Sequence, residues 1–226
     1  MGVCVVDLPI LWEDAALVAV NKPAGLRAIP DGYDPTLPHL HGLLSAQYGR
    51  LWVVHRLDKD TSGVMILARS AAAHRSLSLQ FEQRETRKEY HALVCGAPDW
   101  EEREIDLPLR VNGDRKHRTV IDAAGGRAAF TFCRVLRRWG AFTLLAVYPR
   151  TGYTHQIRAH LAAVGLPIAA DPLYAALARP APPPPIQRTA LHAFQIHFTH
   201  PIQAAPMTLQ APYPADLEEA IGRLGA

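Results

Sequence analysis

The chain has 226 residues, of which 49% are apolar and 20% are charged, so it can bury a sizeable core and is not a disordered chain. Its formal net charge of +3 is compatible with an RNA partner but does not require one. The three cysteines, Cys4, Cys95 and Cys133, lack C-x-x-C spacing and predict neither a disulfide framework nor a zinc site. No apolar run approaches the roughly 20 residues of a membrane helix. The start of the chain has no basic signal-peptide region, so we expect a cytoplasmic protein with free thiols.

The first segments predict a strand, a turn and a short helix. The strand covers residues 17–21, and Pro23 and Gly25 then force a turn. Apolar residues at helical spacing between residues 39 and 47 predict the helix, which Gly49 ends.

Residues 53–63 place a polar segment, HRLDKDTSG, directly before the apolar run of residues 64–68. A polar loop between two strands is how a scaffold holds reactive side chains in a fixed position. A solvated turn would also collect polar residues. A reactive loop is favoured here because the charges adjoin buried strands, where an unpaired carboxylate is costly, and because Arg56 lies beside Asp58.

A helix and a strand follow this segment. Ser70 is placed to cap a helix that runs to about Arg84, with apolar residues recurring every four positions. The strand begins at Glu89, and its alternation places Tyr90, Ala92 and Val94 on one side.

A basic segment occupies residues 104–122 around an Asn-Gly turn, which predicts an exposed hairpin or loop. Its basic side chains are Arg110, Arg115, Lys116, His117 and Arg118. The segment is either a solvated charge cluster or a finger that grips RNA phosphates, and the sequence favours neither interpretation.

The last part of the chain predicts two paired strands, a helix and two further strands. Residues 126–137 and 141–148 form a hairpin, and Thr154 caps a helix that Gly165 ends. His155 and Arg158 then share a neighbouring face near the start of this helix. We also expect a stiff proline spacer at residues 180–185, strands at 191–198 and 207–210, and a final helix from Pro214.

Three blocks of this sequence resemble the motifs of the RluA-type RNA pseudouridine synthases. They are HRLDKDTSG from residue 55, KEYHALV from residue 88 and TGYTHQIRAH from residue 151. The segment NKPAG, residues 21–25, is similar to another stretch of the family. Two departures are visible: Tyr153 stands where the family has Arg, and Ala170 and Ala175 stand where relatives have glycines.

The resemblance implies a single catalytic domain over residues 1–226, without a separate N-terminal RNA-binding domain. It implies an α+β fold, in which a mixed, mostly antiparallel β-sheet is flanked by a few helices and long loops. The implied activity is the isomerisation of specific uridines to pseudouridine in structured RNA, either ribosomal or transfer RNA. We expect a monomer that needs no cofactor and no metal.

The resemblance also assigns roles to residues of this chain. Asp58 corresponds to the catalytic carboxylate, which acts as nucleophile or as base, and Arg158 to the arginine that pairs with it. Tyr90 corresponds to the tyrosine that lines the site against the target base. We expect these three side chains to meet in one pocket. The residues we expect to contact RNA are Arg56, Lys59, His155, Arg115, Lys116 and Arg118.

Arg56 carries a flat cation that can fill the stack vacated by an extruded base, and its alternative role is an ion pair with Asp60. His55 and Thr61 to Gly63 are interpreted mainly as residues that shape the loop.

Two other functions fit parts of the sequence. A metal-dependent phosphodiesterase would use Asp58, Asp60, Asp171 and His55 as ligands, and chelators would abolish its activity. A non-catalytic RNA-binding protein would be unaffected by replacement of Asp58.

Overall fold

A computed structural model of the protein describes residues 8–175 and 183–225. The chain divides into two compact units. Unit 1 comprises Met1–Thr86 and Gln195–Pro212, and unit 2 comprises Arg87–Phe194 and Tyr213–Ala226.

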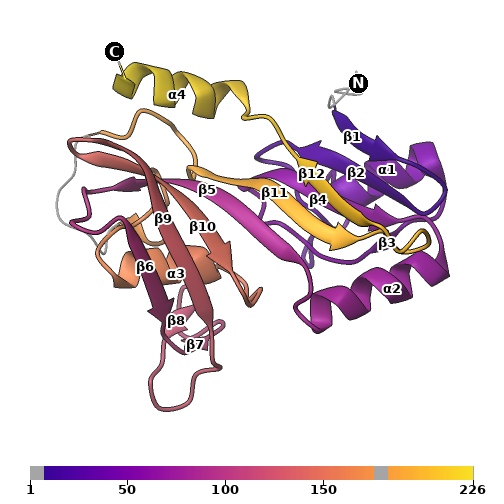
Figure 1. Ribbon diagram of the computed structural model, residues 1–226, viewed down its shortest axis with the longest axis horizontal. Coiled ribbons are helices and arrows are strands. Elements are labelled where there is room, and N and C mark those ends of the chain that lie inside the picture. The colour runs from indigo at the N-terminus through magenta and orange to yellow at the C-terminus, as the bar shows by residue number, and fades with distance from the viewer. Residues whose placement is uncertain (1–7, 176–182, 226) are drawn as a thin grey trace. The chain divides into compact units, whose positions relative to one another are not determined.

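Unit 1 is built on antiparallel strands with two helices. Its elements in chain order are β1 (Ile10–Glu13), β2 (Leu17–Lys22), α1 (Leu40–Tyr48), β3 (Trp52–Val53), β4 (Ser62–Ala68), α2 (Ala71–Glu82), the later part of β11 (Leu191–Thr199) and β12 (Pro206–Gln210). Strand β2 pairs with β1 on one side and with β4 on the other, while β3 also pairs with β4 and β12 pairs with β11 (Figure 1).

The central strands of unit 1 form because they are apolar on both faces. Every residue of β4 is buried, and Leu17 to Val20 of β2 are fully enclosed. Such continuous apolar runs are typical of strands covered on both sides. Helix α2 begins as the sequence predicts, since the Ser70 hydroxyl accepts a hydrogen bond from the Ala73 amide at 3.1 Å.

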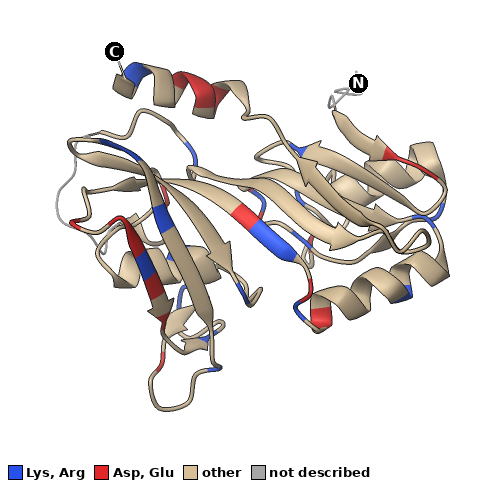
Figure 2. Cartoon of the chain, in the orientation of Figure 1, with Lys and Arg blue, Asp and Glu red and all other residues tan. Residues whose placement is uncertain are grey.

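The described residues of unit 2 form the longer strands and two α-helices. Its elements are β5 (Arg87–Cys95), β6 (Glu102–Asp106), β7 (Leu109–Arg110), β8 (Val120–Ile121), β9 (Phe130–Trp139), β10 (Phe142–Pro149), α3 (Gln156–Ala163), the start of β11 and α4 (Ala215–Gly225). The antiparallel order is β5-β10-β9-β6, and β7 and β8 form a separate hairpin. Figure 2 shows acidic and basic residues alternating along β6.

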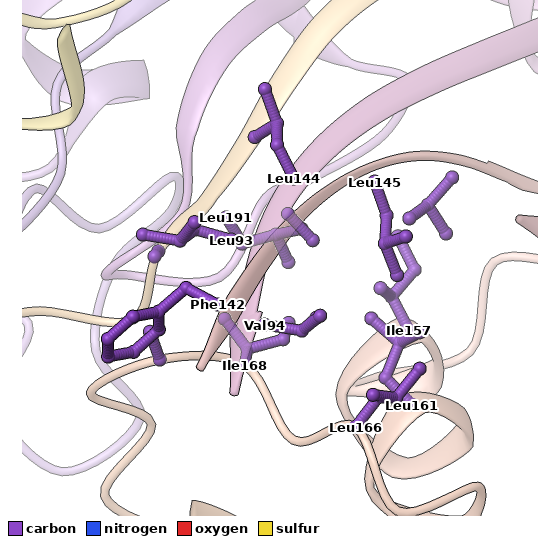
Figure 3. Close-up of a cluster of buried hydrophobic side chains, with 14 of the residues drawn as sticks. Leu93, Val94, Phe142, Leu144, Leu145, Ile157, Leu161, Leu166, Ile168 and Leu191 are labelled. Carbon is purple, nitrogen blue, oxygen red and sulfur yellow. The ribbon is translucent and has the colours of Figure 1, made fainter. Parts of the chain in front are cut away.

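The core of unit 2 lies between its sheet and α3. Figure 3 shows Leu145 of β10 near Ile157 and Leu161, which come from α3. Leu145 is fully buried and lies opposite Ala92 of β5 in the antiparallel register. This packing fixes α3, and with it Arg158, against the strand that carries Tyr90.

These elements confirm the predicted fold class, an α+β fold with a mostly antiparallel sheet and a few helices. Some boundaries differ: β9 begins at Phe130 instead of residue 126 and continues through Trp139, and the hairpin turns at Gly140 and Ala141. Gly140 has a φ of 54°, a left-handed conformation that glycine adopts without steric cost. Part of the predicted proline spacer, residues 180–182, lies outside the described residues. None of the described helices combines the length and apolar character needed to cross a bilayer.

Leu145→Ala tests the core of unit 2. The change leaves a cavity between β10 and α3, and we expect the free energy of unfolding to fall by about 2–5 kcal/mol in urea denaturation. Leu136→Ala is the control, because Leu136 is 40% exposed on β9. Equal losses for the two variants would contradict the placement of Leu145 in the core.

Candidate active site

The loop from β3 to β4 in unit 1, residues 54–61, carries most of the HRLDKDTSG motif, and we call it the signature loop. Hydrogen bonds of its own backbone hold it. The Thr61 amide donates to the Asp58 carbonyl at 3.1 Å, which closes a turn over Lys59 and Asp60. The Lys59 carbonyl accepts from the Gly25 amide at 2.9 Å. The loop that carries Asp58 is therefore joined to the turn of the NKPAG segment.

A buried ammonium group strengthens this junction. The Lys22 side chain is 0% exposed, and its Nζ donates to the carbonyls of Pro23 and Leu26, each at 2.8 Å, and of Lys59 at 3.1 Å. A buried amine must be hydrogen-bonded to offset its desolvation, so these carbonyls hold it in one geometry. Sequence reasoning missed this role, although a lysine at the end of an apolar strand was a usable signal.

His55 shapes the loop, as the sequence predicts. Its Nε2 accepts a hydrogen bond from the Ile66 amide at 3.0 Å, and its ring stacks on Phe81 with centroids 4.7 Å apart. The Nε2 lone pair is therefore already engaged and is not available to a metal.

The side chains expected to act on RNA differ in their surroundings. Arg56 is exposed, and within residues 8–175 and 183–225 its guanidinium forms no ion pair, so the alternative pair with Asp60 is not seen. Lys59 is exposed as well, and Asp58 is partly buried. The loop thus presents one flat cation to solvent beside a sheltered carboxylate.

In unit 2, Tyr90 lies on the face of the sheet that α3 covers. It is opposite Val147 of β10, and Val147 is opposite Cys133 of β9, so the three side chains share one face. Tyr90 is partly buried against the core that includes Ile157. The predicted alternation along β5 is therefore correct.

Helix α3 does not begin as predicted, because Thr154 is not its cap. The N-cap is His155, which has a left-handed φ of 55° and makes no side-chain capping bond. Gln156 organises the turn instead: its Oε1 accepts from the Tyr153 amide at 3.2 Å and from the Thr151 hydroxyl at 2.7 Å. His155 therefore lies before the helix and does not share a helical face with Arg158.

Arg158 forms a buried bidentate ion pair with Asp171. Its Nε lies 2.7 Å from Oδ2 and its Nη2 lies 2.8 Å from Oδ1, and the two side chains are 8% and 0% exposed. Asp171 Oδ1 also accepts from the amides of Leu173 and Tyr174, at 2.9 and 3.2 Å. Both carboxylate oxygens are engaged, so Asp171 is a partner of the guanidinium and not an available metal ligand.

Ala170, directly before Asp171, stands where relatives have a glycine, and its backbone shows why glycine suits this position. Ala170 has a φ of 56°, in the left-handed region where glycine is favoured. An alanine there carries a strain on the order of 1 kcal/mol, which the contacts of Asp171 must offset.

Tyr153, the other departure, packs into an apolar cluster. This cluster contains Leu109, Ala129, Ala159, Ala162 and Tyr174, with Tyr153 and Leu173 packed against it. The aromatic ring thus has a packing role where the family has an arginine.

The basic segment forms the β7–β8 hairpin, as predicted, but its charges are not equivalent. Arg118 pairs with Asp114 at 2.7 Å and Arg110 pairs with Asp122 at 3.0 Å. Arg115 and Lys116 are exposed at the tip, and neither forms an ion pair in the part of the chain that the structure describes. The free positive charge of the hairpin is therefore concentrated at its tip.

A metal site is not formed by the described residues. No group of three or more His, Cys, Asp or Glu among them lies where it could hold an ion. His55 and Asp171, two of the ligands that a phosphodiesterase would use, are committed to the Ile66 amide and to Arg158.

Lys22→Met tests the junction in unit 1. The substitution keeps the volume but leaves three carbonyls without their donor, so we expect the free energy of unfolding to fall by on the order of 3 kcal/mol. Lys59→Met removes an exposed ammonium from the same junction and is the control. Chemical denaturation that showed no difference between the two variants would contradict the role of Lys22.

Comparison with known proteins shows which family the chain resembles. Residues 16–163 match the RNA pseudouridylate synthase family. A ribosomal large subunit pseudouridine synthase D of Nitrosomonas europaea is 36% identical over 224 residues, which cover 94% of this chain and 64% of that protein. A protein of the same name from Xanthomonas campestris is 38% identical over 234 residues, covering 97% of this chain and 70% of the relative.

A solved structure is also similar. The human RNA pseudouridylate synthase domain containing 4 superposes with a TM-score of 0.78 at 26% identity, covering 96% of this chain and 93% of that one. The chain spans 64% of the length of the Nitrosomonas relative and so accounts for part of that protein. Its motifs, its fold and these matches agree: the chain belongs to the RNA pseudouridylate synthase family.

Proposed function

We propose that the chain is an RNA pseudouridine synthase that isomerises specific uridines in structured RNA. The match of residues 16–163 to the family is the observation that carries this proposal, because it spans all three motifs. Asp58 is the catalytic carboxylate, and Tyr90 and Arg158 assist it. The motifs lie in both units, so we propose that residues 1–226 act together as one catalytic domain.

The reaction needs one ionised carboxylate and controlled proton transfer. The bond from uracil N1 to ribose C1′ breaks, the base turns, and C5 bonds to C1′. C5 then loses its proton while N1 gains one, so the product is an isomer. Asp58 serves as nucleophile on the sugar or as the base that takes a ribose proton. Arg158 favours the ionised carboxylate, and the Tyr90 hydroxyl relays a proton.

Access to the base requires its extrusion from the RNA stack, which costs a few kcal/mol. Arg56 suits the vacated position, because its guanidinium is planar, exposed and outside any described ion pair. Lys59, His155, Arg115 and Lys116 are the proposed phosphate contacts, and two of them form the tip of the β7–β8 hairpin.

The name of the Nitrosomonas relative refers to the large ribosomal subunit, which supports ribosomal RNA as the substrate. Transfer RNA is the second candidate. We further propose that the protein acts as a monomer in the cytoplasm and needs no cofactor, because the isomerisation has no redox step.

Asp58→Asn tests the catalytic assignment. We expect tritium release from RNA labelled at uridine C5 to fall by at least about 10³-fold, because the reaction loses its only proposed carboxylate. RNA affinity should stay within about 2-fold, since the change is isosteric. Asp60→Asn is the matched control two residues away and should keep its activity. Tritium release by the Asp58 variant at the rate of the unaltered protein would overturn the assignment.

The salt dependence of RNA binding tests the hairpin tip. Affinity should decrease as salt rises, because bound cations release counterions from RNA. The double change Arg115→Gln, Lys116→Gln should reduce the slope of log affinity against log salt by about 1.5 to 2. Arg223→Gln on α4 provides the control and should leave the slope as it is. An unchanged slope in the double variant would show that the tip does not contact phosphate.

A further inference from the structure

Arg118 differs from Arg115 and Lys116 of the β7–β8 hairpin because its side chain is bound by other groups of unit 2 and is not directed to solvent. Its Nε lies 2.7 Å from Asp114 Oδ2, and its Nη1 donates to the Leu173 carbonyl at 2.9 Å. Its side chain is only 20% exposed. A guanidinium in this position has two acceptors from the protein and little surface left for a phosphate.

Leu173, which accepts the second hydrogen bond of Arg118, belongs to the same turn as Asp171, the ion-pair partner of Arg158. Arg118 holds the Leu173 carbonyl, while the Leu173 amide donates to Asp171 Oδ1 at 2.9 Å. Asp171 in turn forms the bidentate pair with Arg158. A continuous series of polar contacts therefore runs from the hairpin to the arginine of α3.

Tyr174 provides a second connection between the β7–β8 hairpin, which carries Arg118, and α3, which carries Arg158. Its ring lies 5.9 Å from the Arg118 guanidinium carbon and 5.3 Å from that of Arg158. Its hydroxyl accepts from the Thr119 amide at 2.9 Å and donates to the Thr119 carbonyl at 3.0 Å. Burial raises the pKa of this hydroxyl to about 12, so it remains a neutral donor in the physiological range.

The base of the hairpin is anchored to the third motif as well. The Thr119 hydroxyl donates to the Thr154 carbonyl at 2.6 Å, one residue before the N-cap of α3. The Asp114 carboxylate closes the loop above this anchor by accepting from the amides of Lys116 and Arg118. These amide bonds, the Arg118 amide first, lower the pKa of Asp114. The ion pair with Arg118 thus persists at neutral pH.

We propose that Arg118 is a positioning residue for Arg158, tying the β7–β8 hairpin to the Arg158–Asp171 pair. The proposal rests on the function proposed above, in which Arg158 assists the reaction. Arg118 acts through Leu173 and Tyr174, while Arg115 and Lys116 at the exposed tip bind phosphate. The β7–β8 hairpin therefore combines a proposed RNA contact, at Arg115 and Lys116, with a structural link to Arg158. The link, Arg118, lies only two or three positions further along the chain.

Arg118→Lys separates the two possible roles of this residue. Lysine keeps the positive charge that a phosphate contact needs, but it lacks the planar fork that reaches Asp114 and Leu173 together. We expect kcat for tritium release to fall by roughly 10-fold or more, because a small displacement of a catalytic group is costly. KM and the salt slope of RNA binding should stay close to those of the unaltered protein.

The single changes Arg115→Gln and Lys116→Gln are matched comparisons in the same loop. Each should raise KM and reduce the salt slope by about 1, as expected for loss of one phosphate contact. Tyr174→Phe removes the hydroxyl held by Thr119 and should lower kcat as Arg118→Lys does. Thermal unfolding of every variant, compared with Arg223→Gln, shows that each kcat belongs to a folded protein.

The outcomes are distinguishable. If Arg118→Lys keeps its kcat, or if Arg118→Gln raises KM and lowers the salt slope as the tip variants do, the positioning role is wrong. Arg158→Gln measured beside them tests the underlying function. An inactive Arg158 variant with a fully active Arg118→Lys would reject only the link, whereas an active Arg158 variant would reject the role of Arg158 itself.

Discussion

The buried pair between Arg158 and Asp171 constrains most of unit 2. Two charges removed from water lose several kcal/mol of solvation each, and only close bidentate geometry with further hydrogen bonds offsets this loss. Asp171 meets the requirement with two guanidinium contacts and two backbone amides. The start of α3, the turn at residues 171–174 and the base of the β7–β8 hairpin must therefore keep their arrangement. The strained backbone at Ala170 is tolerated for the same reason.

Unit 1 also contains a buried cation, but backbone carbonyls bind it in place of a carboxylate. The Lys22 ammonium is enclosed completely and is held by three backbone carbonyls, one of them in the signature loop. In each unit a buried cation thus fixes a loop by hydrogen bonds to groups that cannot move independently. Such hydrogen bonds leave the loop that carries Asp58, and the turn that holds Arg158, with little conformational freedom.

Local patterns predicted most of the secondary structure and the signature loop. The strands at β2, β4 and β5 and the cap of α2 follow from apolar periodicity and a single serine. The cap of α3 was predicted wrongly, because a glutamine side chain that reaches back to Thr151 outcompetes Thr154. The partners of Lys22 and Arg158 could not be predicted, since the Lys22–Lys59 and Arg158–Asp171 contacts span 37 and 13 residues and depend on the folded chain. The sequence also could not show that Arg118 is bound within the protein while Arg115 and Lys116 are exposed. A count of charges does not show which cation turns inward.

The central claim is that this chain converts uridine to pseudouridine in structured RNA by means of its own side chains. Mapping of pseudouridines in unmodified ribosomal and transfer RNA, with and without the purified protein, tests it most directly. We predict that one or a few uridines in a folded RNA are converted without an added cofactor. If no uridine in either RNA is converted by the folded protein, the claim is contradicted.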